Sequence, residues 1–313
     1  MGIQAPAKVK FNLIAELLSQ GANAPCLSEL CRIAGVSRSG YYRWKSTEDV
    51  RRRREERDRA DFSLISEAYR YRGYAKGARG IHMRLLHQGV RMNLKKIRRL
   101  MKKYGLKCPI RGLNPYRQMA KDMKTNHVAP NVVNREFHSH SPRRVLLTDI
   151  TYIRFKDCFF YLSTILDAVT HEILAYQLSS SLKVDFVIET VNRLIEEHGS
   201  VLDTTTIVHS DQGCHYTSHA FIDKLKKAEF VQSMSRRGNC WDNAPQESFY
   251  GHMKDEIKGI VSNCETFEDV RRIIDDWIDY YNRDRGQWDL FKLAPAEYYE
   301  YIQTGIYPLP LAG

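Results

Sequence analysis

The sequence predicts two regions of different fold class: an all-α N-terminal region followed by an α/β domain. Charge divides the chain in the same way, because residues 1–142 hold 30 Lys and Arg against 11 Asp and Glu, whereas residues 143–313 hold 18 against 26. Apolar residues recur at helical spacing in the first region and form short, turn-separated runs in the second. At 313 residues the chain also exceeds one ordinary domain of about 100–200 residues.

Residues 1–48 are expected to form a helix-turn-helix unit. A first helix should end at Gly21, and Ser28 is expected to cap the second. Gly35 should make the turn, after which Ser37 caps a helix that begins at Arg38. In this arrangement the second helix of the motif enters a DNA groove. The expected groove or phosphate contacts are Arg38, Tyr41, Tyr42, Arg43 and Lys45, with at least one of Tyr42 and Trp44 in the core instead.

Residues 49–105 are expected to contain a spacer helix and a second helix-turn-helix unit. One helix should stop at Gly89, and Asn93 should cap the next, which ends before Gly105. Residues 106–142, with four prolines, are predicted to be a basic linker laid along another surface. The last helix should bury Leu94, Ile97, Leu100 and Met101 and expose basic residues, of which Lys95, Lys96, Arg98 and Arg99 are expected to bind DNA.

The excess positive charge of residues 1–142 suits a polyanion, since neutralised phosphates release counterions. On composition alone, a solvated surface or a ribosomal-type RNA binder explains it equally well. The seven cysteines are odd in number and form no CxxC pair, so neither a disulfide framework nor a zinc finger is indicated, and a reducing cytoplasm fits. The sequence shows no 18-residue apolar run and no secretory signal, which predicts a soluble, unexported protein without a membrane partner.

Residues 143–260 are predicted to form an α/β domain, and residues 261–313 a C-terminal helix and tail. The expected order of elements is three strands, helix, strand, helix, strand, helix, which is that of an RNase H-like fold with a mixed five-stranded sheet and flanking helices. The predicted strands are 145–153, 159–167, 172–178, 205–209 and 230–233, and the predicted helices are 184–198, 218–228 and one that begins after a cap at Asp242 or Asn243.

Three acids are expected to converge at one edge of this sheet. Asp149 lies midway along the first strand, Asp211 just past the fourth, and Glu247 in the first turn of a helix that Pro245 begins. Carboxylates from separate elements can hold two divalent cations about 3.5–4 Å apart, as phosphoryl transfer requires. Lys254 follows Glu247 by two helical turns and would meet a substrate phosphate. The alternative is an ordinary solvated helix, because 26 acids make any single spacing weak.

Other polar residues lie near these acids in the sequence. Asn243, His209 and His215 are candidates for orienting the metal ligands or contacting DNA, with ordinary loop and strand-end roles as the alternative for all three. Trp241 could stack on a base or fill the core under the helix. The spacing of Cys214, Cys240 and His215 matches no standard zinc site.

The residues around the three acids resemble a known family. Segments 148–153, 209–218 and 241–249 are similar to the three signature blocks of the IS3-family insertion-sequence transposases, of the DDE transposase/integrase superfamily. Residues 71–106 resemble that family's second helix-turn-helix region and 41–44 the end of its first, while 280–283 and 293–298 resemble its C-terminal tail. Two departures, Leu146 where many members have Trp and 284–290 in place of Arg-Pro-His, involve no metal ligand.

The resemblance implies that Asp149, Asp211 and Glu247 bind two Mg²⁺ ions, with Mn²⁺ as an alternative, and that Lys254 contacts DNA near the scissile phosphate. The implied reaction is nicking at each transposon end to free a 3′-hydroxyl, followed by strand transfer to another phosphodiester. The implied partners are duplex DNA of the terminal inverted repeats and of the target, a second copy of the chain, and an upstream-frame protein. The implied location is the bacterial cytoplasm, in association with the nucleoid.

Two other functions are open at this stage. The first is a retroviral-type integrase or a ribonuclease H that acts on RNA–DNA hybrids, although two basic helix-turn-helix units favour a reader of duplex DNA. The second is a regulator without enzyme activity, such as a decayed transposase that acts as a repressor. A missing acid would be expected in such a regulator, and all three acids are present.

Overall fold

We analysed a computed structural model of the chain, which describes residues 5–19, 25–108, 129–133, 140–236 and 243–310. The chain divides into two compact units, Met1–Leu64 and Ile65–Gly313, and each is described by itself. Most of the predicted linker, residues 109–128 and 134–139, lies outside the described residues, and so does the segment 237–242. No helix in the described ranges is long and apolar enough to cross a membrane.

The first unit is built from helices α1 (Ala7–Ser19), α2 (Leu27–Ala34), α3 (Arg38–Ser46) and the first part of α4 (Glu48–Arg70). Ser37 caps α3 as predicted, because its Oγ accepts a hydrogen bond of 3.0 Å from the amide of Gly40. Gly35 has φ 63° and makes the turn before it. The helix-turn-helix arrangement of α2 and α3 is thus present.

Two predictions for this unit were wrong. Ser28 does not cap α2: the helix begins at Leu27 with Cys26 as its N-cap, because Leu27 already packs against the core. Tyr41, an expected DNA contact, is buried against Phe11 in that core and cannot reach a groove. The basic and aromatic residues of α3 that remain exposed are Arg38, Tyr42, Arg43 and Lys45, while Trp44 packs at the edge of the core.

The second unit begins with a second helical pair. After α4, a short 3-10 turn (Tyr71–Gly73) leads to α5 (Ala78–His87), Gly89 ends that helix region with φ 74°, and α6 (Leu94–Lys103) follows. Asn93 caps α6 as predicted, since its Oδ1 accepts from the amide of Lys95 at 2.8 Å. The expected faces of α6 are confirmed for most residues: Ile97, Leu100 and Met101 are buried, and Lys95, Arg98 and Arg99 are exposed. Leu94, expected to be buried, and Lys96, expected to be exposed, are both half-buried.

The α/β part has the predicted mixed five-stranded sheet, in the order β3-β2-β1-β4-β5. Strands β1, β2 and β3 pair antiparallel, whereas β4 pairs parallel with both β1 and β5. This is the RNase H-like arrangement that the element order predicted. The strands are β1 (Val145–Phe155), β2 (Cys158–Asp167), β3 (Ile173–Ser179), β4 (Ile207–Ser210) and β5 (Val231–Met234).

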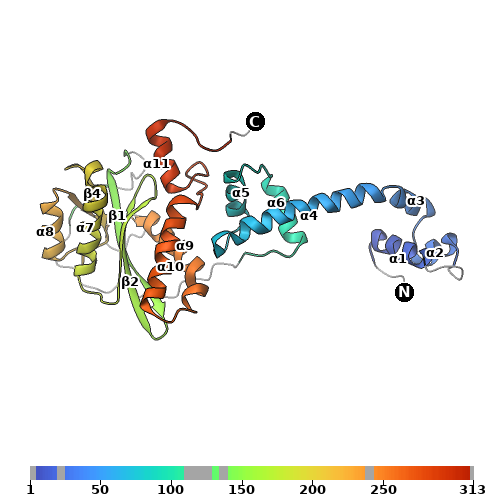
Figure 1. Cartoon of the computed structure of the whole chain (residues 1–313), viewed down its shortest axis with the longest axis horizontal. Helices are drawn as coiled ribbons and strands as arrows, with labels where there is room; N and C mark the ends of the chain where they lie inside the picture. Colours follow the sequence, from blue (N-terminus) through green and yellow to red (C-terminus); the bar gives the residue numbers. More distant parts are fainter. Residues whose placement is uncertain (1–4, 20–24, 109–128, 134–139, 237–242, 311–313) are drawn as a thin grey trace. The chain divides into compact units, whose positions relative to one another are not determined.

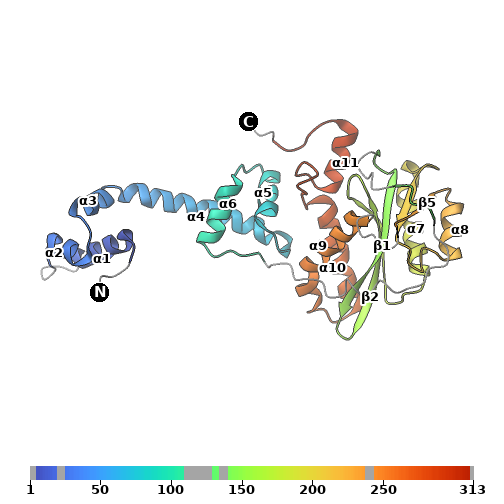
Figure 2. The same cartoon turned by 180° about the vertical axis from the view of Figure 1, so that it is seen from behind.

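Helices cover both faces of this sheet (Figures 1 and 2). Helices α7 (Asp185–His198) and α8 (His219–Lys227) pack on one face, and α9 (Ala244–Val261) and α10 (Phe267–Arg283) on the other. Alternate residues of β1 serve the two cores, because side chains alternate along a strand. Leu146 lies with α7 and α8, whereas Val145 and Leu147 lie with α9 and α10.

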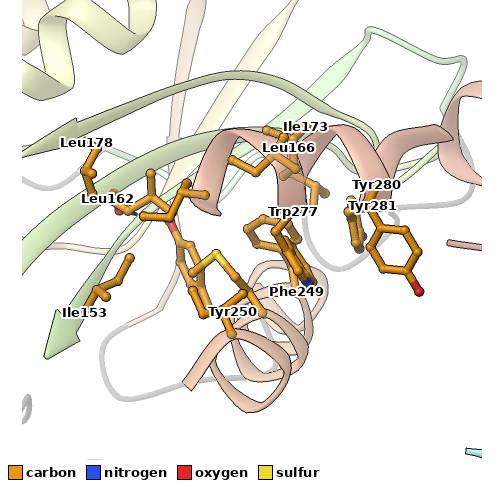
Figure 3. Packing of buried hydrophobic residues seen from close by; sticks show 14 of the residues in the cluster. Ile153, Leu162, Leu166, Ile173, Leu178, Phe249, Tyr250, Trp277, Tyr280 and Tyr281 are labelled. Atoms are coloured by element: carbon orange, nitrogen blue, oxygen red, sulfur yellow. Dashed lines mark hydrogen bonds between the residues drawn. The ribbon is translucent and has the colours of Figure 1, made fainter. Parts of the chain in front are cut away.

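Aromatic side chains form the core beneath α9 and α10 (Figure 3). Phe249 of α9 packs edge-on against Trp277 and Tyr281 of α10, with ring centroids 5.5 and 4.8 Å away. The sequence predicted one helix in residues 261–313, whereas the structure has two, α10 and α11 (Pro295–Thr304). A capping box at Thr266 starts α10, and Pro295 stands in the first turn of α11. Helix α10 is therefore part of the core of the α/β domain.

Candidate active site

Asp149 lies on the face of the sheet that α9 covers. It follows Val145 and Leu147 at strand spacing, and both of these belong to the core beneath α9. Its Cα partner on β2 is Thr164. The side chain is half-buried, and its Oδ1 accepts a hydrogen bond of 2.8 Å from the amide of Ile150. The strand therefore holds this carboxylate in place at the middle of the sheet.

Asp211 lies beside Asp149 because it directly follows β4, which pairs parallel with the strand that carries Asp149. Leu147 pairs with His209, so the acids stand two residues beyond a matched pair on adjacent strands. The amide of Gly213 donates to Asp211 Oδ1 at 2.8 Å. A side chain at Gly213 would place its Cβ 2.9 Å from that same oxygen, so this close approach needs glycine.

Glu247 reaches the same face from α9. The helix begins at Ala244 with Pro245 in its first turn, and Glu247 is the acidic residue of that turn. Lys254 follows two turns later, and both side chains are half-buried. The predicted positions of the three acids along their elements are those in the structure. Trp241 and Cys240, which the sequence placed near the site, lie outside the described residues.

The charges of these four side chains act on one another. Burial raises the pKa of Asp149 well above its ordinary value, the charge of Asp211 raises it further, and Glu247 adds to the effect while Lys254 opposes it. Burial also raises the pKa of Asp211, against the Gly213 hydrogen bond and the charge of His215. Burial lowers the pKa of Lys254, and the charge of Asp149 opposes that change. Sites with opposed or clustered charges of this kind are typical of catalytic centres.

A hydrogen-bonded group that the sequence did not reveal ties α9 to the two central strands. The Tyr250 hydroxyl lies 2.8 Å from Thr164 Oγ1 and donates to the backbone carbonyl of Asp149. The Gln246 side-chain amide donates to the same Thr164 hydroxyl. Both α9 residues are buried, and they flank Glu247 at positions four apart on one helix face. That spacing was the only signal of this group available from the sequence.

Two of the other polar candidates, His209 and His215, have hydrogen-bond partners in the structure. His209, two residues before Asp211, is fully buried on β4. Its Nδ1 lies 2.9 Å from the Oγ of Ser233 on β5. His215 Nε2 lies 2.7 Å from the carbonyl oxygen of Leu182. Asn243 is buried at the N-cap position of α9 and its side chain makes no cap hydrogen bond there, whereas Asp242, the other predicted cap, lies outside the described residues.

The donor chemistry of the three acids suits a hard divalent cation. Carboxylate oxygens are the ligands that Mg²⁺ and Mn²⁺ favour, and a cation between Asp149 and Asp211 would relieve the repulsion that raises the Asp149 pKa. Within the described ranges, no three His, Cys, Asp or Glu side chains already form a group that could hold a metal ion. The acids thus share a neighbourhood without being closed around a ligand position.

Comparisons with known proteins agree with this geometry. Residues 139–240 and 229–287 match two integrase core domain families, and residues 55–112 match an HTH-like domain family. The chain is 34% identical over 216 residues to an uncharacterized transposase-like protein of Haemophilus influenzae, an alignment that covers 68% of this chain and 95% of that protein. The chain belongs to the IS3-family insertion-sequence transposases.

This transposase is also 28% identical over 288 residues to the transposase for insertion sequence element IS629 of Shigella sonnei, covering 91% of this chain and 94% of that one. The crystal structure of the BIV integrase catalytic core domain is similar with a TM-score of 0.41 and 16% identity, over 52% of this chain and 97% of that domain. The family places the protein in the DDE superfamily, as the sequence predicted, and it is an enzyme of DNA transposition. Integrase-core enzymes use divalent metal ions, and DNA is the partner of both matched domain types.

Proposed function

We propose that this transposase binds the terminal inverted repeats of its element and uses Asp149, Asp211 and Glu247 to nick the 3′ ends and transfer them to target DNA. The observation that supports this most is the parallel register that sets Asp149 and Asp211 side by side beneath the helix that carries Glu247. In this proposal the three carboxylates hold two Mg²⁺ ions, or Mn²⁺ in their place. Those ions would activate the attacking oxygen and stabilise the leaving one.

The protein's own residues supply position and charge. Lys254 is half-buried on the face of α9 near Asp149, so its ammonium would neutralise a DNA phosphate next to the acids. Tyr250 and Gln246 hold α9 against β1 and β2, which keeps Glu247 at a constant distance from Asp149. His209, which bonds Ser233 Oγ on β5, would hold the end of β4 that precedes Asp211, and Asn243 at the start of α9 would orient Glu247 or contact DNA. Neither the nicking nor the strand transfer requires a covalent enzyme intermediate.

Several partners belong to the same proposal. Both ends of an element must be held together for transposition, so we infer that at least two copies act on DNA. The exposed Arg38, Arg43 and Lys45 of α3 and the basic face of α6 would contact the ends. Family members often carry an upstream reading frame, whose product would be a further partner. Such a complex would work at the bacterial nucleoid in the cytoplasm.

Labelled DNA that carries the element's ends tests this function. With Mg²⁺ the full chain should make one nick at the 3′ end of each element end and then join the freed 3′ end to a target. The affinity of the chain for the ends should fall steeply as the salt concentration rises. Asp211→Asn should bind the ends normally without nicking or joining. Cleavage of the RNA strand of a hybrid, without nicking at any DNA end, would favour the ribonuclease alternative. Strand joining by Asp211→Asn at the normal rate would refute the metal assignment.

A further inference from the structure

The segment from Tyr71 to His87 belongs to the region matched as an HTH-like domain, yet its basic side chains contact protein. Arg72 makes three ion pairs: with Asp276 at 3.0 Å and Asp279 at 2.9 Å, both on α10, and with Asp284, the residue after that helix, at 3.0 Å. Its own side chain is only 27% exposed. A guanidinium with five donors can satisfy several carboxylates at once, and here it does so.

The backbone at this point is shaped for the contact. Arg72 has φ 54° and Gly73 has φ 72°, so two consecutive residues are left-handed where the chain leaves α4. For a residue other than glycine that conformation costs about 1–2 kcal/mol. This backbone conformation directs the Arg72 side chain toward α10, and the three ion pairs formed there offset its cost in the folded protein.

Two neighbours of Arg72 extend the contact into the core. Tyr74 is buried, its hydroxyl donates to Asp276 at 2.6 Å, and its ring lies 4.8 Å from that of Tyr280. Lys76 is also buried, and its ammonium donates to the backbone carbonyls of Tyr71 and Tyr74, the latter at 2.8 Å. Burial lowers the pKa of Lys76 to about 8. This lysine is therefore committed to the fold and cannot reach a DNA phosphate.

Helix α5 continues the same interface. Arg84 stacks 3.5 Å above the Tyr71 ring and lies 3.6 Å from Asp284. His87 Nε2 lies 2.8 Å from Glu297 of α11. The backbone of the tail passes close to α5, because a Cβ on Gly286 would lie 3.1 Å from the Met83 Cβ and 2.7 Å from the carbonyl oxygen of Lys292.

Charge decides what this surface binds. The side of the protein formed by Asp276, Asp279, Asp284 and Glu297 is acidic and would repel DNA, whereas it complements residues 71–87. On α6 the situation is reversed, since Lys95, Arg98 and Lys102 are exposed to solvent. The two helices of one motif thus present their basic residues to different partners.

We propose that residues 71–87 dock the HTH-like domain onto the acidic side of α10 and the C-terminal tail, and leave the basic face of α6 for DNA. Because the docked domain and the three acids then belong to one body, the docking sets the distance from the bound end to the position of the nick. The second statement rests on the proposed function, whereas the docking contact does not.

Paired variants of the full chain test the proposal on labelled end DNA. Arg72→Glu should keep the end affinity within about twofold, the range of a surface change without a specific contact. Its nicking at the normal position should fall at least about tenfold, with the remaining nicks scattered. The matched control Arg98→Glu should weaken end binding and reduce the salt slope by about 1, with the nick position unchanged. Equal loss of affinity in both variants, with the nick position kept, would overturn the proposal.

Two further measurements separate docking from folding and from the proposed reaction. The combination of Arg72→Asp with Asp276→Arg and Asp279→Arg should restore the nick position, and failure to restore it would count against a charge-based docking contact. Hydrogen exchange without DNA reads the contact directly. Amides of residues 71–87 should exchange faster in Arg72→Glu than in the unaltered chain, even if no end nicking is found with any variant. Unchanged exchange there would refute the docking whatever the enzyme does.

Discussion

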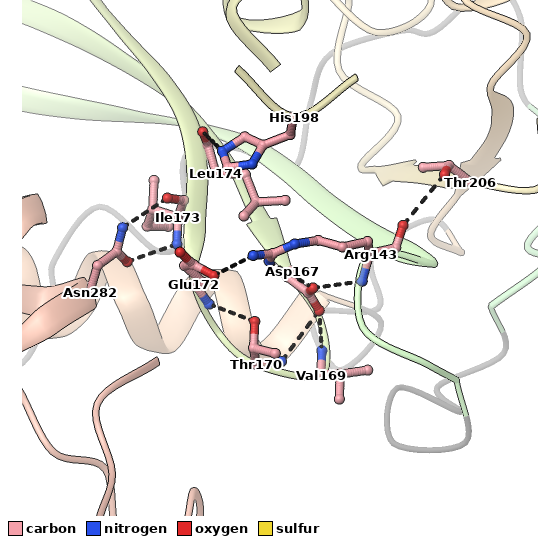
Figure 4. A network of polar contacts seen from close by, with 10 residues as sticks. All are labelled: Arg143, Asp167, Val169, Thr170, Glu172, Ile173, Leu174, His198, Thr206 and Asn282. Carbon is pink, nitrogen blue, oxygen red and sulfur yellow. Dashed lines mark hydrogen bonds and ion pairs between the residues drawn. The ribbon is translucent and has the colours of Figure 1, made fainter. Parts of the chain in front are cut away.

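Two groups of acids on the same sheet differ in how their charge is balanced. Asp167 ends β2 and is fully buried, and it accepts from the amide of Arg143 at 2.7 Å, from the guanidinium of Arg143 at 3.1 Å and from the amide of Val169 at 2.8 Å (Figure 4). Around Asp149, burial and the nearby acids Asp211 and Glu247 raise its pKa, and the hydrogen bond from the Ile150 amide and the charge of Lys254 oppose them without cancelling the rise.

The difference separates stability from catalysis. A buried acid that is fully hydrogen-bonded to an arginine holds loops and strands together, and Arg143 also bonds Glu172 at 2.6 Å. Acids that repel one another cost stability, and such an arrangement is retained where a cation or a substrate completes it. The same residue type thus has opposite effects on the fold, according to its neighbours.

Replacing an acid whose charge is not neutralised by a neighbouring base should have the largest effect on activity and should not lower the stability of the fold. Asp149→Asn should reduce nicking and joining by about a thousandfold or more, the scale found when one member of a catalytic unit is removed. Its melting temperature without metal should be equal or higher, since burial and like charges disfavour the ionised form. Single-turnover nicking and thermal melting measure the two quantities. A large fall in melting temperature would show that Asp149 is a structural acid like Asp167.

Replacing the balanced acid should have the opposite result. Asp167→Asn removes one of the two carboxylates that pair with the buried guanidinium of Arg143 and leaves Glu172 as the other, so the cost should approach the lower end of the about 3–5 kcal/mol for breaking a buried pair on one side. Denaturant unfolding should show this loss, while the protein that remains folded should nick at a normal rate. An unchanged free energy of unfolding would mean that the pair contributes nothing net.

A variant of Tyr250 tests whether the hydrogen bonds between α9 and the sheet position Glu247 relative to Asp149. Tyr250→Phe removes the hydroxyl that bonds Thr164 and the Asp149 carbonyl, a loss of about 0.5–1.5 kcal/mol. If that loss appears in the transition state, nicking should slow by up to about tenfold. The midpoint of the Mg²⁺ titration, followed by the shift of the melting temperature, should rise as well. Tyr281→Phe, equally buried in the same core, should change stability without moving that midpoint.

The smallest expected effect is a pH dependence at a third acid, Glu297, whose ion-pair partner His87 is itself titratable. Burial by itself would lower the His87 pKa, but the Glu297 hydrogen bond reverses this and raises it, and the Glu297 pKa is lowered in turn. The link therefore stabilises the fold between the ordinary pKa values of about 4.3 and about 6.5. Stability is lost as pH rises through the raised His87 pKa, and also as pH falls through the lowered Glu297 pKa.

The difference in unfolding free energy between the unaltered chain and His87→Gln measures this link. It should be largest near pH 5.5 and should shrink toward pH 8, because the histidine is then neutral. Arg84 also faces Glu297 and His87, and its charge does not change over this range. A difference that stays constant from pH 5 to pH 8 would show that His87 packs there without an ionic contribution.

Local signals predicted most elements well where one residue decides the local conformation. Ser37 and Asn93 were identified as caps because their short side chains reach the free amides of a first helical turn. The prediction of Ser28 as a cap was wrong because α2 begins two residues before the expected start, at Leu27, which packs against the core. Tyr41 was mistaken for a DNA contact, since amphipathic spacing on a nine-residue helix does not tell which aromatic side chain faces inward.

The sequence by itself determined the element order, the mixed sheet, the three acids and the family, because these depend on local periodicity and on the residues around each acid. Only the tertiary structure decided that Thr164, Gln246 and Tyr250 join the helix of Glu247 to the strand of Asp149, since those residues lie 82 to 101 positions from their partners. It likewise decided that Arg72 pairs with acids of α10. The sequence does not show whether a basic residue pairs with protein carboxylates or with DNA phosphates. The acids that pair with Arg72 are more than 200 positions away from it.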